Sequence, residues 1–156
     1  MQELVSQLLK VALLATLPVT ELRGAIPIAL TFYHLPVWPT YWFAIAGNLI
    51  PAVLLLKSMK PFSDYLGQWK IFDSFFNWLF KRTRKHEQKY EKYGALFLLF
   101  FVAIPLPGTG VWTGSVAAFL FGIRFWYAFP MMVGGVLIAG LVVTLANLGI
   151  ISILVV

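Results

Sequence analysis

The sequence predicts an all-α polytopic membrane protein made of two inverted repeats that are joined by a basic amphipathic helix. Three observations predict this fold. Of the 156 residues, 60% are hydrophobic and only 12% are charged, about half the charged fraction of a typical soluble domain. The apolar residues fall into four stretches, two of which are too short to cross a bilayer. The two halves of the chain also align at an offset of 87 residues.

The first repeat is expected over about residues 1–57. Its first apolar stretch is expected to be a retained helix rather than a signal peptide, because no small-x-small cleavage site precedes the polar residues. Leu4–Leu17 has 14 residues, which cover about 21 Å of a hydrocarbon core of roughly 30 Å. A break over Pro18–Pro27 follows, and a longer helix is expected at about 40–57. This pattern predicts a re-entrant helical hairpin followed by a transmembrane helix.

The second repeat is expected over about residues 94–156, with a break over Pro105–Gly114 and a long helix at about 126–148. The offset of 87 residues superposes Leu17-Pro18 on Ile104-Pro105, and Gly47 on Gly134. Since each hairpin returns to its own face and each long helix crosses once, the repeats would have opposite topologies. Two alternatives stay open: the similarity is only compositional, or the chain forms four or five ordinary spans kinked at prolines.

The linker between the repeats, about residues 58–93, concentrates the charge of the chain. Nine of the 12 Lys and Arg and four of the six Asp and Glu lie between Lys57 and Lys92. Its apolar residues follow helical spacing, so we expect an amphipathic helix on the cytoplasmic membrane surface. A plain connector helix fits equally well. Because the basic charge belongs to this one segment, we expect no nucleic-acid partner, and residues 1–156 form a single transmembrane domain. The residues expected to contact the membrane surface are Trp69, Trp78, Lys81, Arg82, Arg84 and Lys85.

The first break places Glu21 and Arg23, next to Gly24, inside an otherwise apolar half. Ionisable residues at membrane depth cost several kcal/mol unless they are paired or hydrated, so they are candidates for substrate binding or ion coupling. The alternative is a structural ion pair that locks the hairpin.

The second break holds three glycines, two prolines and two threonines within Pro105–Gly114. Glycine permits close backbone approach and leaves N–H groups free to point at a ligand, so the loop could bind an anion at the start of the next helix. A tight turn that binds nothing is the alternative. The candidate binding residues of this break are Pro105, Pro107, Gly108, Thr109, Gly110, Trp112 and Thr113.

No arrangement typical of an enzyme is visible in the sequence. Cysteine is absent, and neither a Ser–His–Asp arrangement nor a cluster with metal-ligand spacing occurs. We therefore expect no catalytic residue, no metal and no cofactor.

At Glu21-Leu-Arg-Gly-Ala-Ile-Pro27 and at Pro105-Leu-Pro-Gly-Thr-Gly-Val-Trp-Thr-Gly114, the sequence resembles the small multidrug export family of prokaryotic membrane proteins. That family resembles, more distantly, the DedA-like (SNARE-associated) membrane proteins. The resemblance implies a multi-pass protein of the cytoplasmic (inner) membrane with two re-entrant hairpins. It places Glu21 and Arg23 in one hairpin tip and the glycines of the second break in the other. Unlike the DedA pattern, the tips hold one acidic residue and the second tip has no arginine.

The expected function is that of a small secondary transporter, coupled to protons or another ion, which moves an amphiphilic compound across the cytoplasmic membrane. Arg23 and the glycine-rich loop favour an anionic substrate such as a lipid phosphate, whereas a cationic drug would need an uncompensated carboxylate. The alternative is a non-transporting membrane scaffold or assembly factor whose hairpin motifs are structural. The expected partners are the lipid bilayer, the amphiphile and the coupling ion. A homodimer is also plausible, because 156 residues form a thin wall around a pathway.

Overall fold

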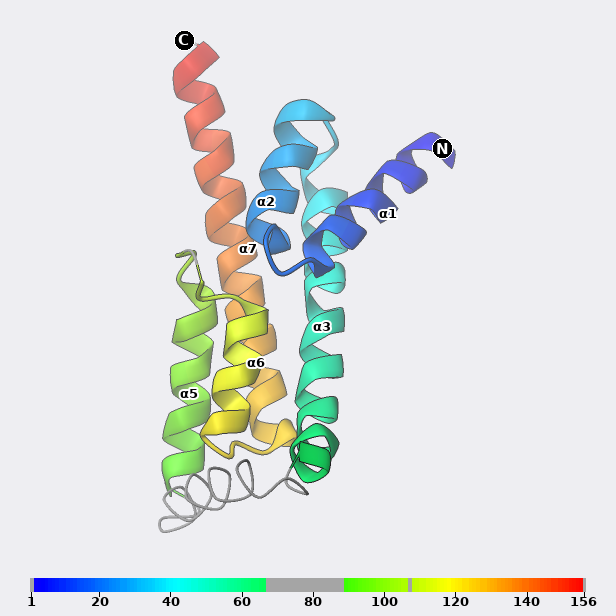
Figure 1. Ribbon diagram of the computed structural model, residues 1–156. Coiled ribbons are helices and arrows are strands. Elements are labelled where there is room, and N and C mark those ends of the chain that lie inside the picture. The colour runs from blue at the N-terminus through cyan, green and yellow to red at the C-terminus, as the bar shows by residue number, and fades with distance from the viewer. Residues whose placement is uncertain (1, 67–88, 107, 156) are drawn as a thin grey trace.

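The computed structural model describes residues 2–66, 89–106 and 108–155. Every regular element within these ranges is a helix, and no strand occurs in them, which confirms the predicted all-α class (Figure 1). The residues predicted to contact the membrane surface lie outside the described residues, as does one candidate of the second break. They are Trp69, Trp78, Lys81, Arg82, Arg84, Lys85 and Pro107.

The first half of the chain forms α1 (Gln2–Thr16), α2 (Glu21–Pro27), the π-helix η1 (Ile28–Phe32) and α3 (Val37–Leu66). Pro27 closes α2 because its ring nitrogen has no hydrogen to donate to the helix ladder. The wider turn of η1 follows, in which the N–H of Tyr33 donates to the carbonyl of Ile28 at 3.3 Å.

The second half forms α5 (Lys89–Ala103), α6 (Val111–Leu120) and α7 (Phe125–Val155). α5 ends where Ile104 precedes Pro105, since a residue before proline is disfavoured in helical conformation. α6 ends at Leu120, and Gly122, two residues later, takes a left-handed conformation with φ of 65° that suits glycine.

Two helices are long and apolar enough to cross a membrane, and each contains one of the long helices expected from the sequence. Their apolar segments are Val37–Ser58, with 22 residues, and Phe125–Gly149, with 25 residues. The whole helices extend beyond the predicted bounds of about 40–57 and 126–148. The hairpin helices Tyr93–Ala103 and Val111–Leu120 are apolar but shorter.

α1 pairs with α2 and α5 pairs with α6, and the two pairs lie toward opposite ends of the molecule (Figure 1). The outer ends of α1 and α2 lie toward the end where α7 finishes, and those of α5 and α6 lie toward the end where α3 finishes. α1 packs on α3 and α5 on α7, while α2 contacts α7 and α6 contacts α3. The turn between α1 and α2 therefore meets the turn between α5 and α6 at mid-height of the molecule.

Glycines allow the long helices to approach the first helix of each pair closely. A Cβ on Gly47 of α3 would fall on the backbone of Ala12 in α1, and a Cβ on Gly135 of α7 would lie 2.8 Å from the carbonyl oxygen of Leu99 in α5. Gly134, next to it, faces the Leu99 side chain. Ala12 and Leu99 are 87 residues apart, as are Gly47 and Gly134, so both halves make this contact at the same register.

Candidate functional site

The two breaks meet through the side chain of Arg23, which lies in α2 and reaches into the turn that follows α5. Its Nη2 donates to the carbonyl oxygens of Val102 at 3.4 Å, Ile104 at 3.3 Å and Thr109 at 3.1 Å. The same nitrogen donates to the Thr109 hydroxyl at 3.1 Å, and Nη1 donates to the Leu106 carbonyl. The last carbonyls of an α-helix have no partner within the helix. Arg23 thus closes the C-terminal end of α5.

Whereas Arg23 binds the C-terminal end of a helix, Glu21 binds the N-terminal end of another. Its side chain is 9% exposed, and its carboxylate accepts hydrogen bonds from the backbone N–H groups of Val111 and Trp112 at the start of α6. A negative charge is stabilised there by unpaired N–H groups and by the helix dipole. A Cβ on Gly110 would overlap this carboxylate, so any larger residue at that position would displace the carboxylate.

The backbone of Glu21 has a φ of 44°, in the left-handed region that non-glycine residues rarely occupy. Such a conformation costs about 1–3 kcal/mol and persists only where the surrounding contacts hold it. Here the contacts are those of the carboxylate with α6. The strain is therefore located at the one acidic residue of the site.

Glu21 and Arg23 are only loosely paired with each other. Their closest atoms, Arg23 Nη1 and Glu21 Oε2, are 4.0 Å apart, while both side chains make hydrogen bonds to the second break. The Nε of Arg23 is buried and has no hydrogen-bond partner. The acid and the base thus join the two halves more than they neutralise one another.

Trp112 makes the reciprocal connection from the second half to the first. Its indole Nε1 donates to the carbonyl oxygen of Thr16, the last residue of α1, at 3.1 Å. Three helix ends at mid-height are therefore closed by side chains from the opposite half: α1 by Trp112, α5 by Arg23 and α6 by Glu21. We call this set of contacts the junction.

The structure brings five of the predicted residues together in the junction: Glu21, Arg23, Thr109, Gly110 and Trp112. Thr113 donates within its own turn, to the carbonyls of Gly108 at 2.7 Å and Gly110 at 3.2 Å. Pro105 and Gly108 are exposed, and a Cβ on Gly24 would meet only the Thr20 side chain. These three lie beside the junction rather than in its hydrogen bonds.

The arrangement differs from the expectation that Arg23 and free N–H groups would face a common anion. Arg23 binds carbonyl oxygens, and the N–H groups at the start of α6 bind the protein's own carboxylate. Sequence patterns do not identify which backbone carbonyls belong to the site, because every residue carries one. The carbonyls not predicted are those of Thr16, Val102, Ile104 and Leu106. The one available signal was the end of α5 before Pro105, which implies carbonyls without helical partners. Among the described residues, no group of three or more His, Cys, Asp and Glu is placed to hold a metal ion.

Comparison with known proteins identifies the family of the chain. A family model described as "Putative small multi-drug export protein" matches residues 21–142, which include the first break from Glu21 onward, the whole second break and most of α7. No curated protein and no solved structure matches the chain. Because the match covers more than three quarters of the sequence and all of the described residues from Glu21 to Val142, the chain belongs to the small multi-drug export protein family.

Proposed function

We propose that the protein is a small secondary transporter that moves an anionic amphiphile across the cytoplasmic membrane of a prokaryote, with the junction as its gate and binding site. The family's description as an export protein and the two helices of membrane-spanning length support transport. One observation carries the assignment to the junction. The anion-binding end of α6 is held by the carboxylate of Glu21, and Arg23 lies beside it.

The interfacial residues of α3 support a position of the junction near mid-membrane. Trp38 is 68% exposed at one end, and Lys57 lies 5.4 Å from the Phe125 ring at the other. Tryptophan and lysine favour membrane–water interfaces. Their separation along the helix is about 29 Å, close to the roughly 30 Å of a hydrocarbon core. Gly47, halfway between them, contacts Ala12 one turn before the end of α1.

The same arrangement supports two re-entrant hairpins related as inverted repeats. The pair α1–α2 opens toward one end of the molecule and the pair α5–α6 toward the other (Figure 1). The contact of Gly47 with Ala12 recurs 87 residues later as the contact of Gly134 with Leu99, which supports a repeat of the same structure in both halves. Transporters of this design place their substrate at interrupted helices near the midplane. Within this proposal the basic linker marks the cytoplasmic face.

Glu21 occupies the position that an anionic group of the substrate would take. A proton on Glu21 removes the charge that α6 stabilises and weakens its bonds to the N–H groups of Val111 and Trp112. The released N–H groups, with the Arg23 guanidinium next to them, then receive the anionic headgroup. Proton uptake by Glu21 thereby promotes substrate binding at the same place, where the headgroup replaces the carboxylate. A lipid phosphate has the chemistry that this replacement of the carboxylate requires.

The test is ligand stabilisation of the purified protein, compared between a polyprenyl phosphate and a lipophilic cation. Wild type should be stabilised by the phosphate, more strongly at mildly acidic pH, where Glu21 is more readily protonated. In Glu21→Gln the stabilisation should lose its pH dependence, and in Arg23→Ala it should disappear. Stabilisation by the cation, strongest at alkaline pH and retained in Arg23→Ala, would reject the anionic substrate. Flux driven by a pH gradient in proteoliposomes then measures transport itself.

A second function, that of a non-transporting membrane scaffold, is favoured by the closed state of the junction. Arg23 donates to four carbonyls and one hydroxyl, as a purely structural fastener would. On this reading Glu21→Gln and Arg23→Ala lower the melting temperature, and neither class of ligand stabilises the wild type at any pH.

A further inference from the structure

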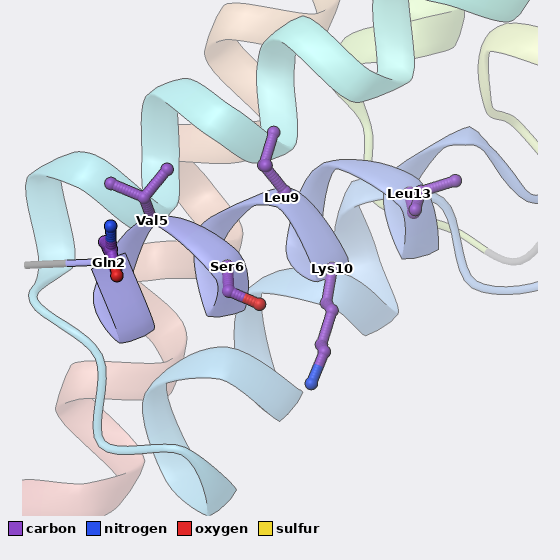
Figure 2. A pocket seen from close by; sticks show the side chains of 6 residues that line it. All are labelled: Gln2, Val5, Ser6, Leu9, Lys10 and Leu13. Carbon is purple, nitrogen blue, oxygen red and sulfur yellow. The ribbon is translucent and has the colours of Figure 1, made fainter.

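The outer face of α1 carries a shallow hollow that is separate from the junction (Figure 2). Its lining residues form two rows with a spacing of four, so that a polar row lies beside an apolar row along one side of the helix. Only the last residue of α1, Thr16, gives its carbonyl to the junction, and the hollow lies before it. The polar row is Gln2, Ser6 and Lys10, and the apolar row is Val5, Leu9 and Leu13.

The apolar row is open to the surroundings of the protein. Leu9 is 53% exposed and Leu13 is 68% exposed, so lipid chains would cover them in a membrane. The apolar row therefore offers a surface on which a hydrocarbon chain can lie.

Lys10 places a positive charge directly beside this surface. Its side chain is exposed, and within the described part of the chain it forms no ion pair. Side chains of an α-helix lean toward its N-terminus, and a lysine extends its ammonium group toward the polar side of the membrane. Ser6 lies one turn away in that direction. Figure 2 shows the Ser6 and Lys10 side chains leaving the same side of α1, away from Leu9.

We propose that this hollow binds one anionic phospholipid. The lipid phosphate pairs with Lys10 Nζ and accepts a hydrogen bond from Ser6 Oγ, and an acyl chain lies along Leu9 and Leu13. The proposal concerns a lipid that stays with the protein rather than a substrate, so it stands apart from the transport function.

The charge of Lys10 also decides between a lipid and a second copy of the chain. Two copies that met symmetrically through this face would bring two Lys10 ammonium groups together in apolar surroundings, which is unfavourable. An anionic lipid neutralises Lys10 instead.

The experiment is native mass spectrometry of the full chain, released from detergent with added phosphatidylglycerol or phosphatidylcholine. Wild type should retain one phosphatidylglycerol about fivefold better than phosphatidylcholine, the preference expected for one lysine near an anionic headgroup. Lys10→Gln should abolish this preference, and Lys10→Arg should keep it. Lys57→Gln, which removes a lysine outside the hollow, is the matched control and should behave as wild type. Equal retention of both lipids by wild type, or an equal effect of Lys57→Gln, would overturn the proposal.

Cross-linking in lipid membranes tests the rival occupant. The chain has no cysteine, so Leu13→Cys introduces a single thiol in the hollow. If a lipid covers this face, oxidation should give no dimer beyond that of an exposed control, Leu145→Cys on α7. Efficient dimer formation through Leu13→Cys alone would show that a second copy occupies the face and would reject the lipid. Neither readout involves transport, so a failure here is distinct from a failure of the proposed function.

Discussion

Arg23 holds the second break with hydrogen bonds that depend on the shape of its side chain as well as on its charge. Nη1 and Nη2 together reach acceptors on both sides of the turn after α5, from Val102 to Thr109. A guanidinium offers five donors in a fixed plane, whereas the ammonium of lysine is a compact point charge with three. An arginine is therefore needed here for geometric reasons.

Substitution of Arg23 should separate charge from geometry. We expect Arg23→Ala to lower the free energy of unfolding by about 3 kcal/mol, because the part-buried carbonyls of Val102 and Thr109 lose their donor at roughly 1–3 kcal/mol each. The carbonyls of Ile104 and Leu106 keep their bonds from Thr109. Arg23→Lys should recover less than half of this loss. Thermal unfolding in detergent measures both, with Lys57→Ala as a control for the loss of a charge elsewhere. A stability of Arg23→Lys equal to wild type would mean that charge alone matters.

Gly110 should tolerate no side chain while Glu21 is in place. In Gly110→Ala the new methyl group would displace the carboxylate from α6, and we expect a loss of about 2 kcal/mol. Gly149→Ala in α7 is the matched control. A Cβ there meets nothing within 4 Å, and alanine favours a helix by up to about 1 kcal/mol over glycine.

The cause of that loss can be checked with a double-mutant cycle. When Glu21 is replaced by alanine, Gly110→Ala should cost less than about 0.5 kcal/mol further, because the colliding group is gone. Additive losses in the double variant would contradict the contact between Gly110 and the carboxylate.

At the scale of the helices, the junction is an exchange of helix caps between the two halves. α1 and α5 end with free carbonyls and α6 begins with free N–H groups, and each end is closed by a side chain from the other half. At the proposed position near mid-membrane, where water is absent, such groups must find partners in the protein. The breaks are consequently stable only when the halves are together.

The closest helix contact should be the one most sensitive to an added methyl group. Gly47→Ala would place a Cβ on the backbone of Ala12, so α1 must move away from α3 at a cost of about 2–3 kcal/mol. Gly134→Ala is the control at the equivalent position of α7. It would meet only the flexible end of Leu99, at 3.2 Å, and should change stability by less than about 0.5 kcal/mol. Unfolding in mixed micelles measures the free energy of unfolding of both variants. Similar losses of stability would contradict the predicted difference.

The helical class and the positions of the breaks could be predicted from the sequence, because proline grouped with glycine and polar residues interrupts an apolar stretch for local reasons. Pro18 and Pro105 both mark such breaks. Isolated prolines do not have this effect, since Pro51 lies inside α3 and Pro130 inside α7. The ends of α3 and α7 lie beyond the predicted bounds, since hydropathy does not mark where a helix ends. Residues 59–66 of α3 are partly polar, whereas residues 149–155 of α7 are mostly apolar. Glu21 and Arg23 were identified because charge is rare in apolar sequence. Their partners were not, since backbone carbonyls and N–H groups carry no sequence signature.

For the whole molecule, the arrangement of the two pairs predicts where each end lies. The start of α1 lies toward the same end as the finish of α7, and the finish of α3 lies toward the end where α5 begins (Figure 1). α3 finishes and α5 begins within the basic linker, about residues 58–93. Under the positive-inside rule, the linker end faces the cytoplasm. Because the chain lacks cysteine, Ser58→Cys and Gln2→Cys can each be labelled alone. An impermeant thiol reagent added outside intact cells should label Gln2→Cys, while Ser58→Cys should react only after the membrane is opened. Labelling of both from outside would refute this topology.

The exchange of caps also has a consequence for how the protein is made. Arg23 enters the membrane long before its acceptors exist, since the nearest of them in sequence, Val102, lies 79 residues further along the chain. At a synthesis rate of about 5–20 residues per second, the ribosome needs roughly 4–16 s to reach it. During this interval the first half holds an acid and a base with no lasting partners, and the insertion machinery must shelter them. The helix ends of the first half are capped only after the second half has been synthesised.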